Sequence, residues 1–525
     1  MSNARLLKVS PVTGPAPSSL RPEHPVARPL AQLVAEFGLD VRGDLDAVEV
    51  TGAALASSAV EPGDLYVGVP GKNVHGASFA AAAAEAGAVA VLTDEVGAQL
   101  AADSGLPVIV TPDPRAALGA VAAWVYRTDE NAATLFGVTG TNGKTSVVYL
   151  LYAILGQLGV VAGLSSTAER RIGEHAITSK LTTPEASELH ALLARMREEG
   201  VRAVALEVSA QALSRHRVDG IEFDVVGFTN LSHDHLDDYA AMDDYFAAKL
   251  ELFQPDRARR GVVTVDSEWG RALVEQSRIP VSTLASVPGV DADWTLTVLA
   301  ETLEDTVFEL SGPDGRRLET RVPLLGAYNA ANAALAIVML VESGYDLHAI
   351  GAALDRDGGI DAYVPGRTER LSGEHGPVVF IDYGHTPDAF ESLLGALRRV
   401  TEGRIVMVFG ADGDRDTTKR ADMGAIAARG ADAVVITDFH PRSEDPATIR
   451  AALLDGARAA VPDAELYEVA DPRAAFRAAL ALAGDGDVVL YAGPGHEDYQ
   501  EVAGQRLPYS ARDDARLALR EAGWL

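Results

Sequence analysis

The sequence predicts an α/β protein of three domains, and three observations lead to that prediction. Short apolar, β-branched runs alternate with amphipathic helical segments along most of the chain, which is typical of parallel sheets covered by helices. The 525 residues suffice for two to four domains of about 150 residues each. The segment Val364–Arg367 has the Pro and Gly of a linker and separates two such alternating series.

The N-terminal part divides into two predicted segments. Residues 1–28 combine many prolines with scattered serines, a composition that resists helix and sheet, so we expect a flexible leader. Residues 29–128 predict a small α/β domain. Its strand candidates are Asp64–Val69 and Ala88–Thr93, and a helix over Pro114–Tyr126 closes it.

The central segment, residues 129–363, begins with a strand, a glycine-rich loop and a helix. The apolar run Thr134–Val138 predicts the strand, and Lys144–Leu158 predicts the helix. Further candidates for buried strands are Ala203–Val208 and Val225–Thr229, again separated by a helical pattern. We therefore expect a mainly parallel sheet.

Residues 364–525 predict a third domain of the doubly wound type. Helices such as Asp388–Arg399 alternate with strand candidates. The strand candidates are Val378–Ile381, Ile405–Phe409, Ala433–Thr437 and Val488–Tyr491. The clusters DYGH, GADGDRD, DFHPR and GPGHE follow these strands, at the carboxyl ends where open parallel sheets bind ligands.

Composition excludes several classes of function. With 45 Lys+Arg against 75 Asp+Glu the net charge is −30, which disfavours binding to nucleic acid or to an anionic membrane. Because the chain has no cysteine, any metal must bind oxygen or imidazole ligands. The sequence has neither an apolar run long enough to span a membrane nor a signal-peptide pattern. We expect a cytoplasmic protein.

The segment GVTGTNGKTS, Gly137–Ser146, predicts a phosphate-binding loop between the first central strand and its helix. Gly140 and Gly143 allow the backbone to curl around phosphates. Lys144 is expected to reach the β- and γ-phosphates and the Thr145 hydroxyl to bind magnesium. Val138 stands where the strict Walker pattern has glycine, so the loop is a variant.

Lysine is rare in this chain, which draws attention to each one. Only six of the 45 basic residues are lysines, and they are Lys8, Lys72, Lys144, Lys180, Lys249 and Lys419. Lysine supplies a point-like ammonium or a deprotonatable amine, and arginine supplies neither. Lys144 fits the first need. Lys249 lies on a predicted helix where a surface lysine would be ordinary, and its rarity favours a functional role.

Carboxylates and histidines follow two central strands. Glu207 and Ser209 come after one, and the other is followed by Asn230, His233, Asp234, His235, Asp237 and Asp238. Because magnesium takes few protein ligands beside waters and phosphates, we expect Thr145 and Glu207 to hold one ion and His235 a second. A zinc site through His233 and His235 is an alternative without a third ligand at diagnostic spacing. Asp237 and Asp238 are expected to be solvated.

Many blocks of sequence, in order from about Pro29, resemble the Mur ligase family. They are PGDLYVGVPG, GTNGKTS, LTTPE, EVS, FTNLSHDHLD, AAK, NAANA, GRTER, DYGHTPDA, FGADGDRD, KRADMG, HPRSEDP and GHE. The resemblance is closest to the members that add the third amino acid to UDP-N-acetylmuramoyl-L-alanyl-D-glutamate. It implies an ATP-dependent amide ligase of peptidoglycan synthesis, with domains for UDP, for ATP and for the amino acid, and a monomer acting on small molecules.

The resemblance also implies roles for individual residues. Those matching contacts to the UDP substrate are Leu55, Ser57, Lys72, Asn73, Val74, Thr182, Thr183, Ser209, Arg215 and Arg217. Those matching ATP contacts are Gly140, Thr141, Asn142, Gly143, Lys144, Thr145, Ser146, Asn329, Arg367, Asp382 and His385. Glu207 and His235 match magnesium ligands, and Lys249 matches a lysine that the family carries as a carbamate formed with CO₂.

The predicted amino-acid site departs from the family pattern. Its residues are Arg415, Phe439, His440, Pro441, Arg442, Gly493 and Glu497. Phe439 and His440 replace the Asp and Asn of the DNPR motif of diaminopimelate-adding members, and Pro494 replaces a lysine. Diaminopimelate is the family default, while lysine, ornithine or a shorter diamino acid stays open. Folylpolyglutamate synthesis and a non-catalytic nucleotide-binding paralogue are the competing functions.

Overall fold

The computed structural model describes residues 21–173, 175–372 and 375–525, so residues 1–20 of the predicted leader and Lys8 lie outside it. Within the rest of that segment, Arg21 donates to the buried carboxylate of Asp64 at 2.6 Å. The chain forms two compact units, described separately below. The first comprises residues 21–133, 161–173, 175–204 and 215–221, and the second residues 134–160, 205–214, 222–372 and 375–525.

The first unit is built on a five-stranded sheet of order β2-β7-β6-β5-β4, parallel except for β2. Its elements are β1 (Arg28–Pro29), α1 (Leu30–Phe37), β2 (Asp40–Arg42), β3 (Glu49–Val50), β4 (Gly52–Ala54), β5 (Asp64–Gly68), α2 (Ala80–Glu85), β6 (Ala90–Thr93), α3 (Glu95–Leu100), β7 (Val108–Val110) and α4 (Pro114–Tyr126). Apolar side chains of β5, β6 and α4 form its core.

Four further elements belong to the first unit. They are β9 (Ala162–Ser165), β10 (Glu169–Ile172), β11 (His175–Thr178) and α6 (Ala186–Glu198). The three strands form an antiparallel meander. Strand β12 (Ala203–Glu207) crosses the division between the units along the chain.

The second unit begins with a sheet that is parallel from β8 through β13, β14 and β15 to β16, and antiparallel from β16 to β18. Its elements are β8 (Thr134–Thr139), α5 (Lys144–Gln157), α7 (Ala210–Ser214), β13 (Phe223–Phe228), α8 (Met242–Leu250), β14 (Ala258–Thr264), α9 (Glu268–Gln276), β15 (Val281–Ala285), β16 (Trp294–Glu301), β17 (Thr306–Ser311), β18 (Arg317–Val322), α10 (Ala327–Glu342) and α11 (Leu347–Asp357). Helices α5 and α10 pack together.

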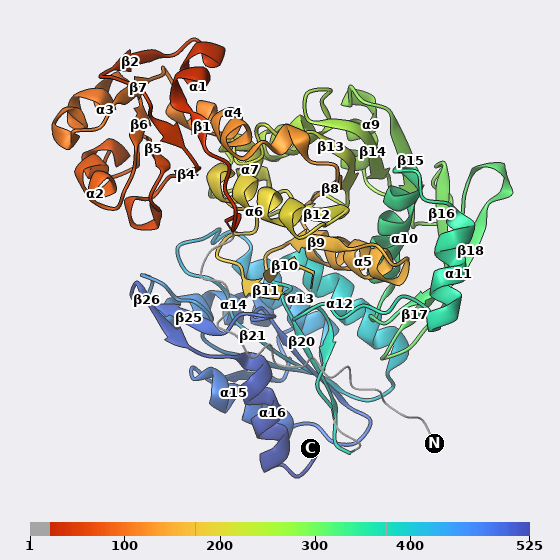
Figure 1. Ribbon diagram of the computed structural model, residues 1–525. Coiled ribbons are helices and arrows are strands. Elements are labelled where there is room, and N and C mark those ends of the chain that lie inside the picture. The colour runs from red at the N-terminus through yellow and green to blue at the C-terminus, as the bar shows by residue number, and fades with distance from the viewer. Residues whose placement is uncertain (1–20, 174, 373–374) are drawn as a thin grey trace. The chain divides into compact units, whose positions relative to one another are not determined.

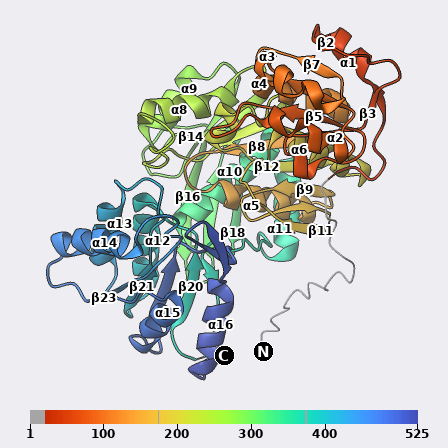
Figure 2. The ribbon, with the colours of Figure 1, turned by 90° about the vertical axis from the view of Figure 1, so that its left-hand side faces the viewer.

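The C-terminal part of the second unit is a six-stranded sheet of order β19-β20-β24-β21-β22-β23. Its elements are β19 (Glu369–Arg370), β20 (Val378–Asp382), α12 (Pro387–Val400), β21 (Ile405–Phe409), α13 (Arg420–Gly430), β22 (Ala433–Ile436), α14 (Pro446–Ala460), β23 (Leu466–Glu468), α15 (Pro472–Ala481), β24 (Val488–Ala492), β25 (Tyr499–Val502), β26 (Gln505–Pro508) and α16 (Ala511–Glu521). Helices α12, α13 and α14 cover one face, and α15 and α16 cover the other (Figures 1 and 2). This confirms the doubly wound arrangement.

The local pattern of the sequence located most of the elements that carry the predicted site. The helix predicted over Pro114–Tyr126 is α4, and the strand predicted over Ile405–Phe409 is β21. The expectation of mainly parallel sheets is confirmed as well. The antiparallel strands β16 to β18 and the meander β9 to β11 were not predicted.

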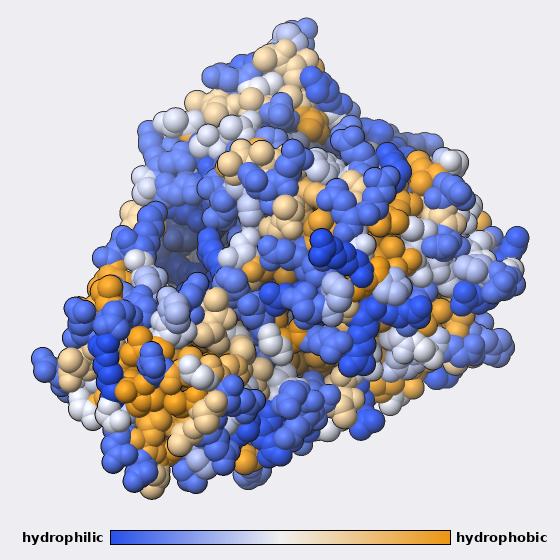
Figure 3. All heavy atoms as spheres, turned by 90° about the horizontal axis from the view of Figure 1, so that it is seen from above, coloured by the Kyte–Doolittle hydropathy of each residue, from blue (hydrophilic) through white to orange (hydrophobic). Residues whose placement is uncertain are grey.

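The surface agrees with the composition. The face seen from above is mainly hydrophilic, with apolar side chains in separate patches (Figure 3). Within the described ranges, no helix combines the length and apolar character needed to cross a membrane.

Histidine 190, on α6, is buried and neutral, and this predicts acid sensitivity. Its two ring nitrogens lie 2.8 Å from Thr128 Oγ1 and 2.9 Å from the Asp219 carbonyl oxygen. Burial lowers the pKa of His190 from 6.5 to about 4. The unfolded chain therefore takes up a proton below about pH 6.5 that the folded chain excludes, and stability falls from there down to pH 4.

We expect this histidine to lower the free energy of unfolding by about 1.4 kcal/mol per pH unit within that window. Chemical denaturation of the wild type and of His190→Gln between pH 4 and 7 measures it, because the variant loses this part of the slope. His175→Gln, at an exposed position of the same unit, is the control. Equal slopes for wild type and His190→Gln would contradict the prediction.

Candidate active site

The loop between β8 and α5 has the geometry of a phosphate-binding loop. Gly140 and Gly143 adopt φ angles of 148° and 88°, a backbone region that favours glycine. A Cβ atom at Gly140 would lie 1.8 Å from Thr229 Oγ1, and one at Gly143 would lie 2.5 Å from Asn332 Oδ1. Both glycines are therefore required by close packing as well as by conformation, and Lys144 begins the helix as predicted.

The segment that follows β13 holds this loop in place. The amide of Thr141 donates to the Asn230 carbonyl oxygen, and the amide of Asn142 donates to Asn230 Oδ1, both at 2.9 Å. Thr229 Oγ1 donates to the Asn142 carbonyl oxygen at 2.6 Å. Strands β8 and β13 are neighbours in the sheet, which explains why residues about 90 positions apart meet. The Thr229 contact was not predicted from the sequence.

The side chain of Lys144 folds back onto the phosphate-binding loop that precedes it. Its Nζ donates to the carbonyl oxygens of Gly140 and Thr141 at 2.9 and 2.8 Å. Burial lowers the pKa of Lys144, while the nearby carboxylates of Glu207 and Asp234 raise it. An ammonium ion held only by carbonyl oxygens is ready to exchange them for phosphate oxygens.

The side chain of Lys249, on α8, reaches the same loop as Lys144. Its side chain is 1% exposed, and its Nζ donates to the Gly140 carbonyl oxygen at 2.8 Å, so two lysines share one carbonyl. Burial and the proximity of Lys144 lower the pKa of Lys249 well below its usual value. A lowered pKa makes the ammonium lose its proton more readily, and only the neutral amine can react with CO₂.

Tyr245 is a member of this cluster that the sequence analysis did not identify. Its ring centre lies 4.3 Å from Lys249 Nζ, and its hydroxyl lies 3.3 Å from Thr141 Oγ1. The signal was available, because residues four apart on a helix share a face.

The predicted magnesium ligands fit the ion by their chemistry. Glu207, at the end of β12, is buried, and Thr145 presents a hydroxyl at the N-terminus of α5. Burial lowers the pKa of His235 to about 4, so the imidazole is neutral and able to bind a cation. One carboxylate, one hydroxyl and one imidazole suit magnesium, which takes its remaining ligands from water and phosphates.

The zinc alternative finds no support. His233 Nε2 lies 3.1 Å from Asp416 Oδ2, so this histidine has a protein partner. Among the residues that the structure describes, no three His, Asp or Glu side chains gather into a metal site. Asp237 and Asp238 are exposed, as expected.

The residues predicted to meet ATP from the C-terminal part lie at or near the loop. Arg367 Nη2 donates to Thr145 Oγ1 at 3.0 Å, and its guanidinium carbon lies 4.3 Å from the centre of the Tyr383 ring. Asp382 is buried and accepts from the amides of Thr368 and Gly384 at 2.6 Å each, so it shapes the turn that presents Arg367. Burial raises the pKa of Asp382.

Two other predicted ATP contacts are fixed by their own neighbours. Asn329 is buried on α10 and donates through Nδ2 to the Leu325 carbonyl oxygen at 2.8 Å. His385 Nδ1 lies 2.7 Å from the Tyr383 carbonyl oxygen, and the loop residue Asn142 donates to Asp388 Oδ2 at 3.2 Å. The structure therefore brings Asn142 and Asp388, 246 residues apart, into contact.

Most of the residues predicted for the UDP substrate lie in the first unit. Lys72, Asn73 and Val74 are exposed on a turn after β5. Arg217 is buried and forms an ion pair with Glu185 at 3.0 Å. The remaining members are placed as follows: Leu55 and Ser57 are partly buried after β4, Thr182 is partly buried, Thr183 is buried, and Arg215 is exposed.

Ser209 belongs to the second unit. Its Oγ accepts from the Ala212 amide at 3.1 Å, and it stands two residues after Glu207, so it shares the loop that ends β12.

His440 is the centre of the predicted amino-acid site. Its Nδ1 accepts from the Glu501 amide at 2.8 Å, and its Nε2 lies 2.6 Å from Glu497 Oε2. Because Nδ1 accepts, Nε2 carries the proton and donates to Glu497. The centre of the His440 ring also lies 4.2 Å from the centre of the Phe439 ring. Both nitrogens of His440 thus have protein partners.

The other residues of the predicted amino-acid site lie near charged partners or at sharp turns of the backbone. Arg442 donates to Asp412 Oδ1 at 3.2 Å, and Arg415 lies 3.5 Å from Asp237 Oδ2. His440 and Arg442 have φ angles of 36° and 52°, a strained conformation for residues with side chains that is common at binding sites. Gly493 adopts a φ of 111° at the end of β24, and Pro441 is buried.

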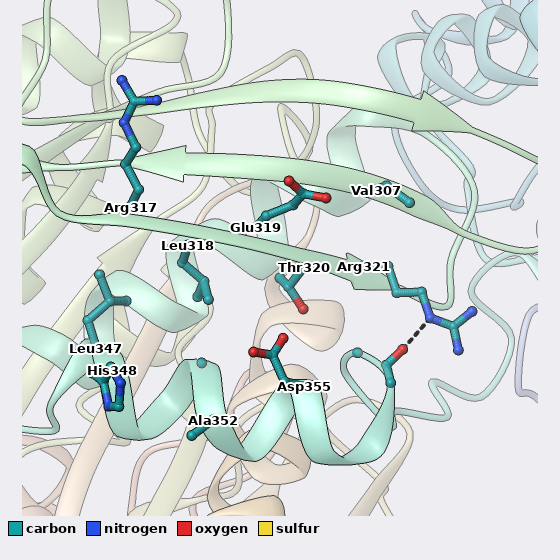
Figure 4. A pocket seen from close by; sticks show the side chains of 13 residues that line it. Val307, Arg317, Leu318, Glu319, Thr320, Arg321, Leu347, His348, Ala352 and Asp355 are labelled. Carbon is teal, nitrogen blue, oxygen red and sulfur yellow. Dashed lines mark hydrogen bonds between the residues drawn. The ribbon is translucent and has the colours of Figure 1, made fainter.

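A cavity of about 610 Å³ lies elsewhere, between β18 and α11. Arg317, Glu319, Arg321 and Asp355 are among its lining residues (Figure 4). None of the predicted site residues lines it, so we do not connect it with the chemistry of the loop.

Comparison with known proteins gives three family matches along the chain. Residues 49–126 match the model described as Mur ligase family, catalytic domain, residues 138–340 match the Mur ligase middle domain, and residues 366–495 match the Mur ligase glutamate ligase domain.

Relatives and a solved structure agree with these matches. The chain is 86% identical, over 98% of its length and 100% of the relative, to the UDP-N-acetylmuramyl-tripeptide synthetase of Leifsonia xyli. It is 47% identical, over 96% of its length and 98% of the relative, to the UDP-N-acetylmuramoyl-L-alanyl-D-glutamate–2,6-diaminopimelate ligase of Streptomyces avermitilis. A solved structure of a ligase with that second name has a TM-score of 0.63 at 25% identity, covering 95% of this chain and 100% of that one.

Proposed function

The chain belongs to the Mur ligase family, and from this premise we propose that it is an ATP-dependent ligase that adds a diamino acid to UDP-N-acetylmuramoyl-L-alanyl-D-glutamate in peptidoglycan synthesis. A cytoplasmic, monomeric enzyme with small-molecule substrates is part of the proposal. The observation that carries it is the pair of lysines, Lys144 and Lys249, on the Gly140 carbonyl of a phosphate-binding loop.

The first step activates a carboxylate. A peptide carboxylate is a poor electrophile, so its oxygen attacks the γ-phosphorus of ATP, the bond to the bridging oxygen breaks, and an acyl phosphate and ADP result. Lys144 and the loop amides stabilise the charge on the transferring phosphoryl group. The hydrogen bond from Arg367 to Thr145 supports a role for Arg367 in contacting the nucleotide from the C-terminal part.

The second step forms the amide. The amine of the diamino acid attacks the acyl carbon, and the tetrahedral intermediate expels phosphate. Water would destroy the acyl phosphate, so the C-terminal part must exclude it. Contacts such as that of Asn142 with Asp388 support this role for the chain between residues 366 and 525.

Magnesium is assigned to Thr145, Glu207 and His235, with Lys249 as a carbamate adding a negative charge. When bound, the ion supplies charge neutralisation at the phosphates. The carbamate is supported by the burial of Lys249 and by its lowered pKa. A carbamate beside Lys144 would replace repulsion between two amines by attraction.

For the third residue we propose diaminopimelate or another diamino acid. The name of the Streptomyces avermitilis relative supports diaminopimelate. Arg442 and Arg415 provide positive charge for a carboxylate, while Glu497 and Asp412 provide negative charge for an amine. Because both nitrogens of His440 have protein partners, a hydrogen bond from either nitrogen to the amino acid would have to replace one of these contacts.

Two alternatives are less well supported. A folylpolyglutamate synthase would have no use for the PGDLYVGVPG block of the first unit, which resembles the uridine module. A non-catalytic paralogue would have no need for a buried lysine at Lys249, since burying an amine is unfavourable.

The test is an amino-acid panel with the purified chain, ATP, magnesium and UDP-muramoyl-dipeptide, with products identified by mass. We expect ADP and a tripeptide product only when the dipeptide and a diamino acid are both present. Diaminopimelate, lysine, ornithine and diaminobutyrate compete in the same panel, and alanine is the matched control without a second amine. Amide formation on folate, or none on any acceptor, would contradict the proposal.

A further inference from the structure

Lys419 is a buried lysine to which the proposed reaction gives no role. The residue is 6% exposed, and among the described lysines only Lys249 is more buried. It stands at the N-cap of α13 and makes no side-chain cap. A cation at a helix N-terminus is disfavoured by the helix dipole, and burial is a further cost. The position of Lys419 therefore depends on a partner.

That partner is Asp234, which also lies in the interior. Lys419 Nζ lies 3.1 Å from Asp234 Oδ1, and the two side chains are only 7% and 8% exposed. The residues are 185 positions apart. A buried ion pair has a narrow range of acceptable geometries, and removal of one partner leaves an uncompensated charge.

Asp234 divides its two oxygens between Lys419 and His235. Oδ2 lies 3.5 Å from His235 Nε2, so the carboxylate lies beside the imidazole ring. His235 adopts a φ of 58°, and its ring meets that of Tyr245 edge-on at 5.8 Å. Carboxylates in this position commonly orient histidines that bind metals.

Two flanking contacts join the same segments but are more exposed. His233 lies 3.1 Å from Asp416, and the side chains of His233 and Arg415 are 42% and 46% exposed. Exposed pairs of this kind contribute little. The Lys419–Asp234 pair is therefore the contact that fixes residues 233–235 against residues 415–419.

We propose that Lys419 is a positioning residue whose ammonium, through the Asp234 carboxylate, holds the His235 imidazole in place for a divalent cation. The inference rests on the proposed function in assigning His235 to the metal. It adds a link between the segment that carries Arg415 and the metal site.

The test measures binding of Mn²⁺ to the full chain in the presence of ADP, from the electron paramagnetic resonance signal of free Mn²⁺. We expect Lys419→Met to weaken Mn²⁺ binding about 10- to 100-fold and Lys419→Arg to retain more of it. The Mg²⁺ concentration for half-maximal ligation should rise in parallel. Arg398→Met, which breaks the exposed pair with Asp432, is the matched control and should bind Mn²⁺ like wild type.

The double variant Lys419→Met/Asp234→Asn separates positioning from folding. It removes both charges, so its thermal midpoint should recover relative to Lys419→Met while its Mn²⁺ binding stays weak. If Lys419→Met does not fold, Mn²⁺ binding by the double variant alone tests the inference. Wild-type Mn²⁺ affinity in the double variant, or no Mn²⁺ binding by the wild type, would overturn the inference. The proposed function is tested separately, because absence of ligation by the wild type would contradict it whatever the Mn²⁺ affinity.

Discussion

Replacement of Lys144 by alanine is expected to abolish ATP use. The Lys144 ammonium is held at 2.8 to 2.9 Å by two loop carbonyls, so it lies on the loop where the phosphates are expected. Loss of one such charge typically lowers kcat by about 10²- to 10³-fold, and here it also removes a binding contact. Release of ADP with the dipeptide and amino acid present measures the effect.

The fold should survive this change, because the Lys144 side chain makes no ion pair in the described structure and is only half-buried. Circular dichroism and the thermal midpoint check this. Arg259→Ala, at an exposed pair with Glu222 on β14, is the control and should keep full activity. Undiminished ADP release by Lys144→Ala would remove the phosphate-loop assignment.

The second large effect is expected for Lys249→Arg, which should keep the fold and lose most activity. Arginine keeps a basic side chain of similar reach, but a guanidinium does not lose its proton and forms no carbamate. We expect ligation to fall by about 10²-fold or more, since the charge that completes the metal site is missing. The measurement is product formation at saturating substrates.

Carbon dioxide supplies an independent readout for the same residue. Removal of CO₂ and bicarbonate should lower wild-type ligation, and bicarbonate should restore it, while Lys249→Arg should respond to neither. A carbamate carbon signal after addition of ¹³C-bicarbonate should appear in the wild type alone. Wild-type turnover by Lys249→Arg would refute the carbamate assignment.

Local sequence was enough for the phosphate-binding loop. A strand, two glycines with positive φ angles, and a lysine that begins a helix all lie within Thr134–Gln157. The doubly wound C-terminal sheet was predictable for the same reason, because runs such as Ile405–Phe409 are apolar throughout and buried on both faces. The three-domain boundaries and the roles of individual site residues stay predictions.

Long-range packing decided what local patterns could not. Asp234 and Lys419 look like ordinary charged loop residues until the fold places them together in the interior. His440 stays a predicted ligand contact, and only the fold shows that its ring lies beside Glu497 and the Glu501 amide. Strands β16 to β18 were overlooked because half-exposed antiparallel strands lack a continuous apolar run.

The sequence by itself therefore determined the chemistry available to this protein: a loop for phosphates, a scarce set of lysines and a choice of oxygen and imidazole ligands. The tertiary structure alone decided which of these groups are buried and which meet. The reason is physical, because desolvation and ion pairing depend on neighbours far away in the chain. They lower the pKa of Lys249 and make Lys419 the partner of Asp234.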